Sequence, residues 1–325
     1  MRAAYYVKNG PAREVLSVAE VDTPRPGRGE VRVKLKVSGV NPSDVKAREG
    51  RTRKIAWPRV IPHSDGAGEI DMVGDGVPAA RVGERVWVWN AQWKRAFGTC
   101  ADYVVLPTAL AVPLPALVGF DAGACLGIPA MTAYHAVALA GAGKGRTVLV
   151  TGGAGGVGHY AIQFAKARGA TVLTTVSSEA KATLARQAGA DHVIDYKRED
   201  VGERAMAITG KAGVDAVVEM DLAANASLYP SLLRARSAIV VYGTGSAQAA
   251  IPAQFLLVNA IAIRFVYVYE LTSEERTAAI SAITRMLENK TLINNVALAL
   301  QLNDIAAAHE AVEQGKVMGN VVVTL

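Results

Sequence analysis

Cysteine is scarce in this chain of 325 residues, which contains only Cys100 and Cys125. Two cysteines are too few for a disulfide framework, so we expect a reducing, cytoplasmic setting. No run of about eighteen apolar residues occurs, and therefore no membrane-spanning helix is predicted. The segment Met1–Lys8 lacks the apolar core of a signal peptide, and the chain shows neither internal repeats nor low-complexity segments.

The residues that are present suit a globular protein of two domains. Apolar residues make up 51% of the chain and charged residues 20%, and the length exceeds that of one typical domain. The net charge is +6, with one concentration of basic residues. Such a run is usually a solvated loop, and the alternative is an anionic ligand nearby; nucleic-acid binding is disfavoured because no nucleic-acid motif accompanies the charge. The run comprises Lys46, Arg48, Arg51, Arg53, Lys54 and Arg59.

The pattern of apolar residues changes near residue 118. Before it, short strands and turns, such as the alternating segment 30–37, indicate a compact and mostly β domain. After it, strands and helices alternate at a spacing typical of right-handed βαβ units and a doubly wound parallel sheet. We therefore predict an α/β protein with a β-rich domain over 1–118, a cofactor domain over 119–264, and a segment 265–325 that completes the first domain. The predicted strands are 148–151, 171–176, 192–195, 215–220, 238–242 and one near 261–268, with a helix at 178–187, a helix at 273–288 and a terminal strand at 320–325.

A glycine cluster follows the first strand of the second domain. Gly153, Gly155 and Gly158 fit the spacing G-x-G-x-x-G, and a helical pattern runs from there to Gly169. The first glycine is expected to allow a tight turn, the second to let the backbone approach a pyrophosphate, and the third to let the helix pack on the strand. The helix N-terminus then offers free N–H groups to phosphate. The strand and helix on either side favour a dinucleotide site over a glycine-rich loop with no ligand.

The end of the second strand should select the cofactor. NAD-type sites place Asp or Glu there to bind the ribose 2′-hydroxyl, but this strand ends without an acid. Ser177 and Ser178 can donate hydrogen bonds to a 2′-phosphate, and Lys181 can pair with it. Glu179 falls in the first helical turn, where an acid is favoured by the helix dipole alone. We predict NADPH as the cofactor, although a serine here is also an ordinary helix cap.

Six segments together resemble the zinc-independent quinone oxidoreductases (zeta-crystallin type) of the medium-chain dehydrogenase/reductase superfamily. The resemblance spans the whole chain, with the segments in family order. It implies a GroES-like catalytic domain, a Rossmann domain that binds NADPH, and a homodimer. The segments are 40–44 (VNPSD), 61–68 (IPHSDGAG), 127–134 (GIPAMTAY), 152–158 (GGAGGVG), 188–196 (AGADHVIDY) and 308–316 (AHEAVEQGK).

The resemblance also implies roles for individual residues. Asn41 and Thr132 should lie at the nicotinamide end of the cofactor, and the glycine loop should hold the pyrophosphate. Ser178, Lys181 and Tyr196 should surround the 2′-phosphate. The other implied cofactor residues are Gly155, Gly156, Val157, Gly158, Ser177, Asn225, Gly243, Thr244, Tyr267, Val268 and Tyr269, and the two tyrosines are also implied near a dimer contact.

Several positions depart from the related families. Zinc-dependent relatives place a cysteine ligand where Asn41 stands and a His-Glu pair where Ser64-Asp65 stands, so no metal site is expected. His63 has no partner ligands in the sequence and is expected to be a buried structural histidine. Several quinone reductases have tyrosine where Lys46 stands, so a substrate-side tyrosine is not implied here. Gly-Lys is frequent in the family where Gly319-Asn320 stands, so a basic cofactor contact is not implied there either.

Without zinc there is no Lewis acid to polarise an alcohol or aldehyde, so the substrate must accept hydride readily. A quinone or an enone does so, because the negative charge spreads over a conjugated oxygen. Asn41 is the candidate donor to that oxygen, and Asp44 is either an orienting group or a helix cap. The alternatives are an enoyl-thioester reductase, whose carrier phosphate the basic run would bind, and a non-enzymatic NADPH-binding protein. A zinc alcohol dehydrogenase is nearly excluded by the missing ligands.

Overall fold

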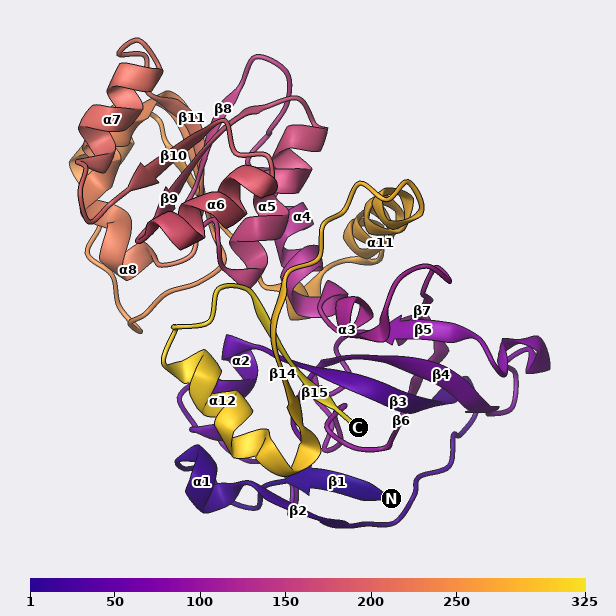
Figure 1. Ribbon diagram of the computed structural model, residues 1–325. Coiled ribbons are helices and arrows are strands. Elements are labelled where there is room, and N and C mark those ends of the chain that lie inside the picture. Colours follow the sequence, from indigo (N-terminus) through magenta and orange to yellow (C-terminus); the bar gives the residue numbers. More distant parts are fainter. The chain divides into compact units, whose positions relative to one another are not determined.

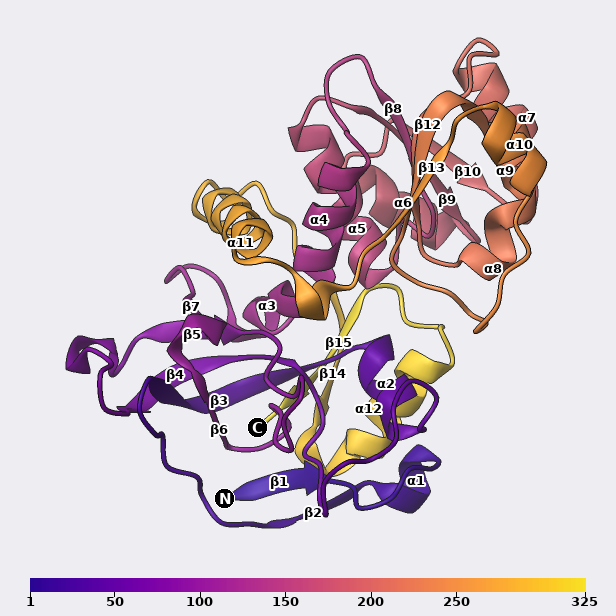
Figure 2. The same ribbon diagram turned by 180° about the vertical axis from the view of Figure 1, so that it is seen from behind.

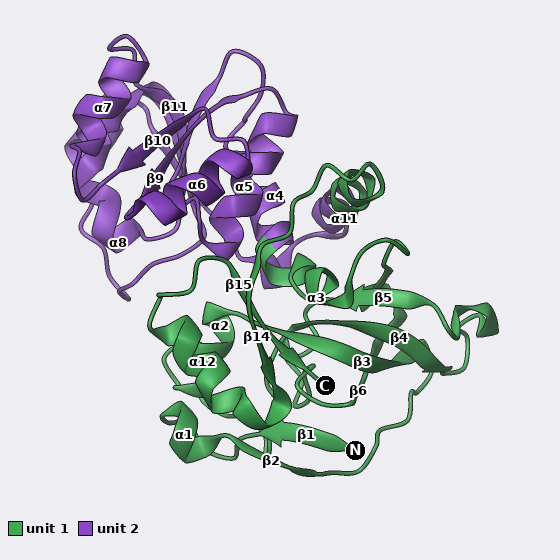
Figure 3. Cartoon of the chain, viewed as in Figure 1, with its two compact units in different colours: residues 1–129, 280–325 green, residues 130–279 purple.

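A computed structural model describes all residues, 1–325, and divides them into two compact units. The first unit holds residues 1–129 and 280–325, and the second holds residues 130–279 (Figure 3). Both boundaries lie later in the chain than the changes of pattern near 118 and 265. At the first boundary the cause is local: Ile128 donates its N–H to Asp65 at 2.9 Å, which ties this segment to the sheet of the first unit.

The second unit is a doubly wound parallel sheet of six strands in the order β10-β9-β8-β11-β12-β13 (Figure 1). All neighbouring strands are parallel, with Val148 opposite both Val172 and Ala216. Helices on both faces exclude water, which explains the continuous apolar runs. The predicted Rossmann fold is confirmed. The strands are β8 (Thr147–Val150), β9 (Thr171–Val176), β10 (His192–Asp195), β11 (Val214–Glu219), β12 (Leu233–Val241) and β13 (Ala262–Phe265).

Helices of the second unit cover the two faces of this sheet (Figures 1 and 2). On one face α4 (Met131–Leu139), α5 (Gly156–Ala167) and α6 (Glu179–Gln187) pack in sequence. On the other, a core formed by Leu149, Leu173 and Val217 packs against α7, α9 and α10. These and the remaining helices are α7 (Val201–Ile208), α8 (Leu222–Asn225), α9 (Tyr229–Leu232), α10 (Ala253–Val258) and α11 (Ser273–Glu288), which contains the second unit boundary.

The first unit is built on a sheet in the order β14-β15-β3-β4-β5-β7, with β6 also paired to β3. The end of the chain joins this sheet, because β15 pairs antiparallel with β3 and places Val323 opposite Ser38. Residues 280–325 thus belong to the first unit, whereas residues 265–279 belong to the second. The strands are β1 (Arg2–Tyr5), β2 (Ser17–Glu20), β3 (Glu30–Val40), β4 (Asp65–Val73), β5 (Arg85–Val88), β6 (Tyr103–Pro107), β7 (Ala111–Pro113), β14 (Val296–Gln301) and β15 (Asn320–Thr324).

Short helices complete the first unit. They are α1 (Ala12–Val15), α2 (Pro42–Arg48), α3 (Phe120–Gly123) and α12 (Ile305–Glu313). Single turns of 3-10 or π helix occur in both units; they are η1 (Ala79–Arg81), η2 (Thr108–Leu110), η3 (Leu126–Ala130), η4 (Ala226–Leu228), η5 (Val268–Glu270) and η6 (Leu302–Asp304). Among all these helices, none combines the length and the apolar character that crossing a membrane requires.

Candidate functional site

The glycine loop joins β8 to α5 and leaves the first turn of the helix open. Gly155 is the N-cap of α5 and has no side chain to accept a hydrogen bond. The first N–H groups of a helix have no partner within it, so those of Gly156, Val157 and Gly158 are available to an anion. N–H groups of this kind, together with the helix dipole, favour an anion at the helix N-terminus, and the pyrophosphate contact stays a prediction.

Each glycine of this loop has a different steric role. Gly152, with φ of +67°, makes the left-handed turn that the sequence analysis assigned to Gly153, and this is a correction. Gly153 is required by crowding instead, because a Cβ there would lie 2.1 Å from the Thr174 hydroxyl oxygen. A Cβ on Gly158 would lie 2.3 Å from the Gly152 carbonyl oxygen, whereas a Cβ on Gly155 would meet that oxygen at 3.3 Å. Gly158 therefore permits close packing, and Gly155 borders open space.

The residues predicted to select the cofactor meet at the end of β9. Lys181 donates from Nζ to the Ser177 hydroxyl at 3.0 Å, and its backbone N–H donates to the Ser178 hydroxyl at 3.4 Å. Ser178 is thus the cap of α6, as its alternative interpretation allowed. Tyr196 reaches the same strand end, because its N–H donates to the Val176 carbonyl at 3.1 Å, and its side chain is exposed. A cation and hydroxyls, with no carboxylate on the strand end, suit a phosphate.

A buried carboxylate, which the sequence analysis missed, organises the end of β11. Glu219 is fully buried and accepts hydrogen bonds from Thr151 at 3.0 Å, Asn225 at 2.8 Å and Tyr229 at 3.3 Å. It also accepts the N–H of Asp221 at 2.7 Å. The signal that could have revealed it is an acid directly after the apolar run Ala216–Val218. The amide of Asn225, predicted to contact the cofactor, is engaged by this carboxylate.

The remaining predicted residues of the second unit lie on three further segments. Gly243 follows β12, its carbonyl accepts the Leu222 N–H at 3.3 Å, and Thr244 closes a turn by donating to Ser246 at 2.8 Å. Thr132 is buried at the start of α4. Tyr267, Val268 and Tyr269 follow β13, where the two tyrosine rings lie 5.3 Å apart around the buried Val268.

In the first unit, Asn41 is held between the buried carboxyl groups of Asp44 and Asp65. Its Nδ2 donates to Asp65 at 2.8 Å, and its backbone N–H donates to Asp44, also at 2.8 Å. Asp44 is the third residue of α2 and closes the helix cap, which was one of its two interpretations. Burial raises the pKa of Asp44 to about 7 and that of Asp65 well above its usual range. Ile128 also donates its N–H to Asp65, so this fixed carboxyl group holds the Asn41 amide in place.

A buried chain of hydrogen bonds leads from Asp65 to α12. The Thr99 hydroxyl donates to the Asp65 carbonyl, so it must accept from Ser38 at 2.7 Å. Ser38 then accepts from Nδ1 of His63 at 2.8 Å, and Nε2 of His63 accepts from Nε2 of His309 at 2.9 Å. Both histidines are neutral: burial lowers the pKa of His63 to about 3 and that of His309 well below its ordinary value. His63 is the buried structural histidine that was predicted.

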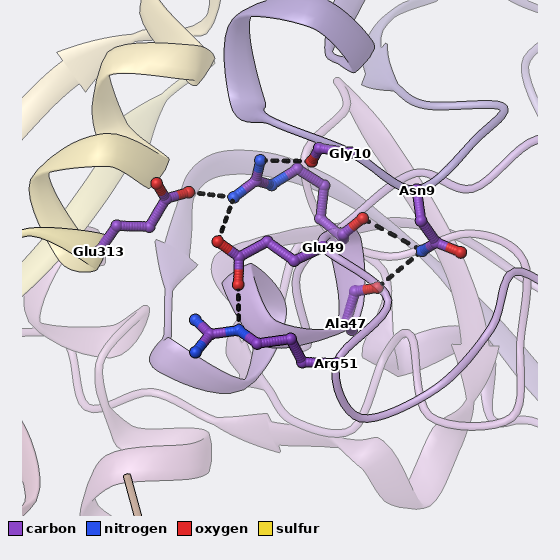
Figure 4. A network of polar contacts seen from close by, with 7 residues as sticks. Asn9, Gly10, Ala47, Glu49, Arg51 and Glu313 are labelled. Atoms are coloured by element: carbon purple, nitrogen blue, oxygen red, sulfur yellow. Dashed lines mark hydrogen bonds and ion pairs between the residues drawn. The ribbon is translucent and has the colours of Figure 1, made fainter. Parts of the chain in front are cut away.

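The basic run from Lys46 to Arg59, which begins in α2, is not exposed to solvent along its whole length. Arg48 is fully buried and donates to the Gly10 carbonyl at 2.7 Å and to Glu313 of α12, with Glu49 at 3.6 Å (Figure 4). Arg51 pairs with Glu49. The interpretation of the whole run as a solvated loop is therefore wrong for Arg48, whose charge fastens α12 to α2. Nowhere in the chain do three or more His, Cys, Asp or Glu side chains gather as a metal site would need.

Comparisons with known proteins agree with this architecture. The family profile described as "Alcohol dehydrogenase GroES-like domain" matches residues 27–116, and the profile described as "Zinc-binding dehydrogenase" matches residues 156–285. The quinone oxidoreductase of Rattus norvegicus is 36% identical over 245 residues, which cover 75% of this chain and 73% of that protein.

Two solved structures superpose along the full chain. A mycobacterial protein complexed with NADPH gives a TM-score of 0.90 at 29% identity, and an NAD-dependent alcohol dehydrogenase gives 0.92 at 30% identity. In both comparisons the match covers 100% of this chain and 100% of the other. The fold is therefore shared by proteins that use different cofactors and substrates, and the choice between them depends on the residues of the site.

Proposed function

Because the chain belongs to the quinone oxidoreductase family of the medium-chain dehydrogenase/reductase superfamily, we propose that it is an NADPH-dependent enzyme that transfers hydride to quinones or other conjugated carbonyl compounds. The observation that carries the proposal lies at the end of β9, where Lys181 is hydrogen-bonded to Ser177 and the strand does not end in an acidic residue. An acid there would repel a 2′-phosphate, whereas an ammonium group attracts it. The mycobacterial structural relative is complexed with NADPH, which supports the same choice.

The proposed cofactor brings the hydride, and the chain's own residues bind and orient it. The open first turn of α5 binds the pyrophosphate at Gly156, Val157 and Gly158. The residues at the end of β9, with Tyr196, hold the 2′-phosphate. Thr132, Asn225, Gly243, Thr244, Tyr267, Val268 and Tyr269 remain predicted contacts along the rest of the cofactor.

The reaction is proposed to proceed without zinc, because the residues at the zinc positions of related families are committed elsewhere. Asn41 stands where a cysteine ligand is expected, and its amide is bonded to Asp65. Asp65 in turn accepts the N–H of Ile128, so both of its oxygens already accept hydrogen bonds from the protein. Without a Lewis acid, the acceptor itself must delocalise the charge, as quinones and enones do.

Asn41 is the proposed contact to the reacting groups. The Asn41 carboxamide nitrogen has two N–H bonds. One donates a hydrogen bond to Asp65, and the other can donate to the carbonyl oxygen of an acceptor. Asp44 and Asp65 act through Asn41 and are positioning residues. A neutral amide fixed in this way stabilises a developing oxyanion without needing to titrate.

A homodimer is proposed from the edge of the second unit's sheet. The edge strand β13 pairs only with β12, and its Phe265 side chain is 68% exposed. Leu257, Val258 and Tyr267 beside it are more than half exposed as well. An unpaired edge carrying apolar side chains is a site for strand pairing between chains. Light scattering after size-exclusion chromatography should give about twice the 34.1 kDa of one chain.

The experiment that tests the function is a series of acceptors followed through the absorbance of reduced nicotinamide at about 340 nm. We expect oxidation of NADPH with 1,4-benzoquinone or 1,2-naphthoquinone, slower oxidation with simple enones, and little with saturated aldehydes. Oxidation of primary alcohols with no quinone activity would overturn the proposal. Tight binding of NADPH with no turnover of any acceptor would favour the non-enzymatic alternative.

A further inference from the structure

Two neighbouring loops of the first unit, residues 50–61 and 90–98, carry a charge that the proposed reaction does not use. We call them the cationic loops. Their backbones are bonded side by side: Ile61 donates its N–H to the Ala96 carbonyl at 3.0 Å, and Gly98 donates to the Ile61 carbonyl at 2.8 Å. The two loops therefore form one surface.

The charged residues of this surface are all positive. The cationic loops contain no acidic residue, and their basic residues are Arg51, Arg53, Lys54, Arg59, Lys94 and Arg95. Arg51 is paired with Glu49, but Arg53 and Arg59 are held by neutral groups. Arg53 donates to the Gln92 amide oxygen and lies 5.7 Å from the centre of the Trp93 ring. Arg59 lies over the Tyr5 ring at 4.6 Å. Guanidinium groups placed in this way keep their attraction for an anion.

The first of the cationic loops begins at the helix that Asn41 caps. Arg51 and Thr52 donate their N–H groups to the carbonyl of Lys46 in α2, at 2.9 and 3.4 Å. The charge of Arg53 also acts on Asp44, because it opposes the rise that burial causes in the pKa of that carboxyl group. Arg53 thus lies within electrostatic reach of the cap that holds Asn41.

An open surface pocket of about 350 Å³ is lined by residues of both cationic loops and by Val7. Its lining is apolar apart from one cation and includes no acid, and Trp57 on its wall packs on Tyr6 in a small core. Burial raises the pKa of Tyr6 to about 12; the charge of Arg53 opposes this rise, and the charge of Asp44 adds to it. The lining residues are Val7, Trp57, Pro58, Arg59, Ala96 and Phe97. An apolar body with an anionic substituent matches such walls.

We propose that the acceptor reduced beside Asn41 is an anionic conjugated carbonyl compound, whose carboxylate, sulfonate or phosphate binds the cationic loops at Arg53. The open pocket on the same cationic loops, with the rings of Trp57 and Phe97 and the charge of Arg59, gives the apolar part of the acceptor a neighbouring surface. This inference rests on the proposed function and narrows its substrate class. It also gives the basic run a role that does not require a thioester carrier.

The test compares 1,2-naphthoquinone-4-sulfonate with neutral 1,2-naphthoquinone as acceptors of NADPH. In Arg53→Gln, kcat/KM for the sulfonate should fall about tenfold, while that for the neutral quinone changes less than about twofold. Arg53→Lys should restore part of the loss. The matched control is Arg28→Gln, which removes one charge from an exposed site outside the cationic loops and should affect both acceptors equally.

A binding measurement separates this inference from the proposed function. Naphthalene-1-sulfonate should quench the tryptophan fluorescence of the wild type and of Arg28→Gln, and about tenfold more ligand should be needed with Arg53→Gln. If neither quinone is reduced, the proposed function fails and this binding still decides the anion site. Equal binding by Arg53→Gln and Arg28→Gln, or an unchanged ratio of kcat/KM between the two quinones in Arg53→Gln, would refute the inference.

Discussion

Substituting alanine at two glycines of the loop between β8 and α5 should separate packing from phosphate binding. At Gly158 the new Cβ would lie 2.3 Å from the Gly152 carbonyl oxygen and 2.9 Å from its carbonyl carbon. Ordinary contact begins near 3.4 Å, so the loop and the helix must move apart by about 1 Å. At Gly155 the same atom would meet only that oxygen, at 3.3 Å, and the backbone there, with φ of −77°, accepts alanine.

The expected magnitudes follow from these contacts. Overpacking against backbone costs about 1–3 kcal/mol, and the better helix propensity of alanine returns about 0.5–1 kcal/mol. Gly158→Ala should therefore lose about 1–2 kcal/mol of unfolding free energy, or about 2–8 °C in Tm. Gly155→Ala should lose less than about 1 kcal/mol. Both variants should bind NADPH at least about tenfold more weakly, the first because the N–H groups move, the second because a methyl group enters the pyrophosphate space.

The assay is a thermal melt paired with a fluorescence titration of NADPH on each variant. The account requires Gly158→Ala to be impaired in both measurements and Gly155→Ala chiefly in the titration. A Gly158→Ala protein with the melting temperature and affinity of the wild type would refute the steric reasoning. A Gly155→Ala protein with unchanged affinity would show that the phosphate lies elsewhere.

Three further predictions concern the cofactor, the buried histidines and the amide. Lys181→Ala should reduce the preference for NADPH over NADH by about tenfold or more in a comparative titration, since a charge-assisted contact is lost; equal loss for both cofactors would contradict this. The low pKa values of His63 and His309 should destabilise the fold as pH falls below about 6.5, where the unfolded histidines bind protons and the folded ones do not. His309→Gln, which can still donate to His63, should flatten denaturant-derived stability between about pH 6.5 and 3 relative to wild type; an unchanged slope would contradict the neutral pair. Asp65→Ala should lower kcat more than NADPH affinity, because it frees the Asn41 amide, and an unaltered kcat would exclude its positioning role.

The strands and helices of the second unit could be predicted because the pattern of apolar residues in each segment fits only one type of secondary structure. β9 and β10 lie where the strand pattern placed them, and α11 covers the predicted residues 273–288. Local signals suffice there, since β9 follows Gly169-Ala170 and ends before Ser177, and β10 follows Asp191. The start of β12 is different: Leu233–Ser237 extends the strand beyond the predicted segment, because pairing with β11 continues past a shift of register at Val214.

The site was predictable only where its residues are close in sequence. The glycine loop and the end of β9 each lie within one short segment, so spacing alone was enough to propose them as cofactor contacts. The contact of His63 with His309 joins positions 246 residues apart, and no local pattern indicates it. Glu219 was missed for a related reason: its importance comes from Thr151 and Tyr229, which the sheet brings to it from other elements. Such contacts depend on tertiary packing and not on periodicity.

The most direct test of the central claim is the rate of NADPH oxidation with 1,4-benzoquinone by enzyme that has been dialysed against EDTA and checked for zinc by elemental analysis. We expect less than stoichiometric zinc and an undiminished rate, because Asn41 and Asp65 bind each other and no cluster of metal ligands exists. One tightly held zinc per chain, lost on dialysis together with the activity and restored with it, would contradict the account.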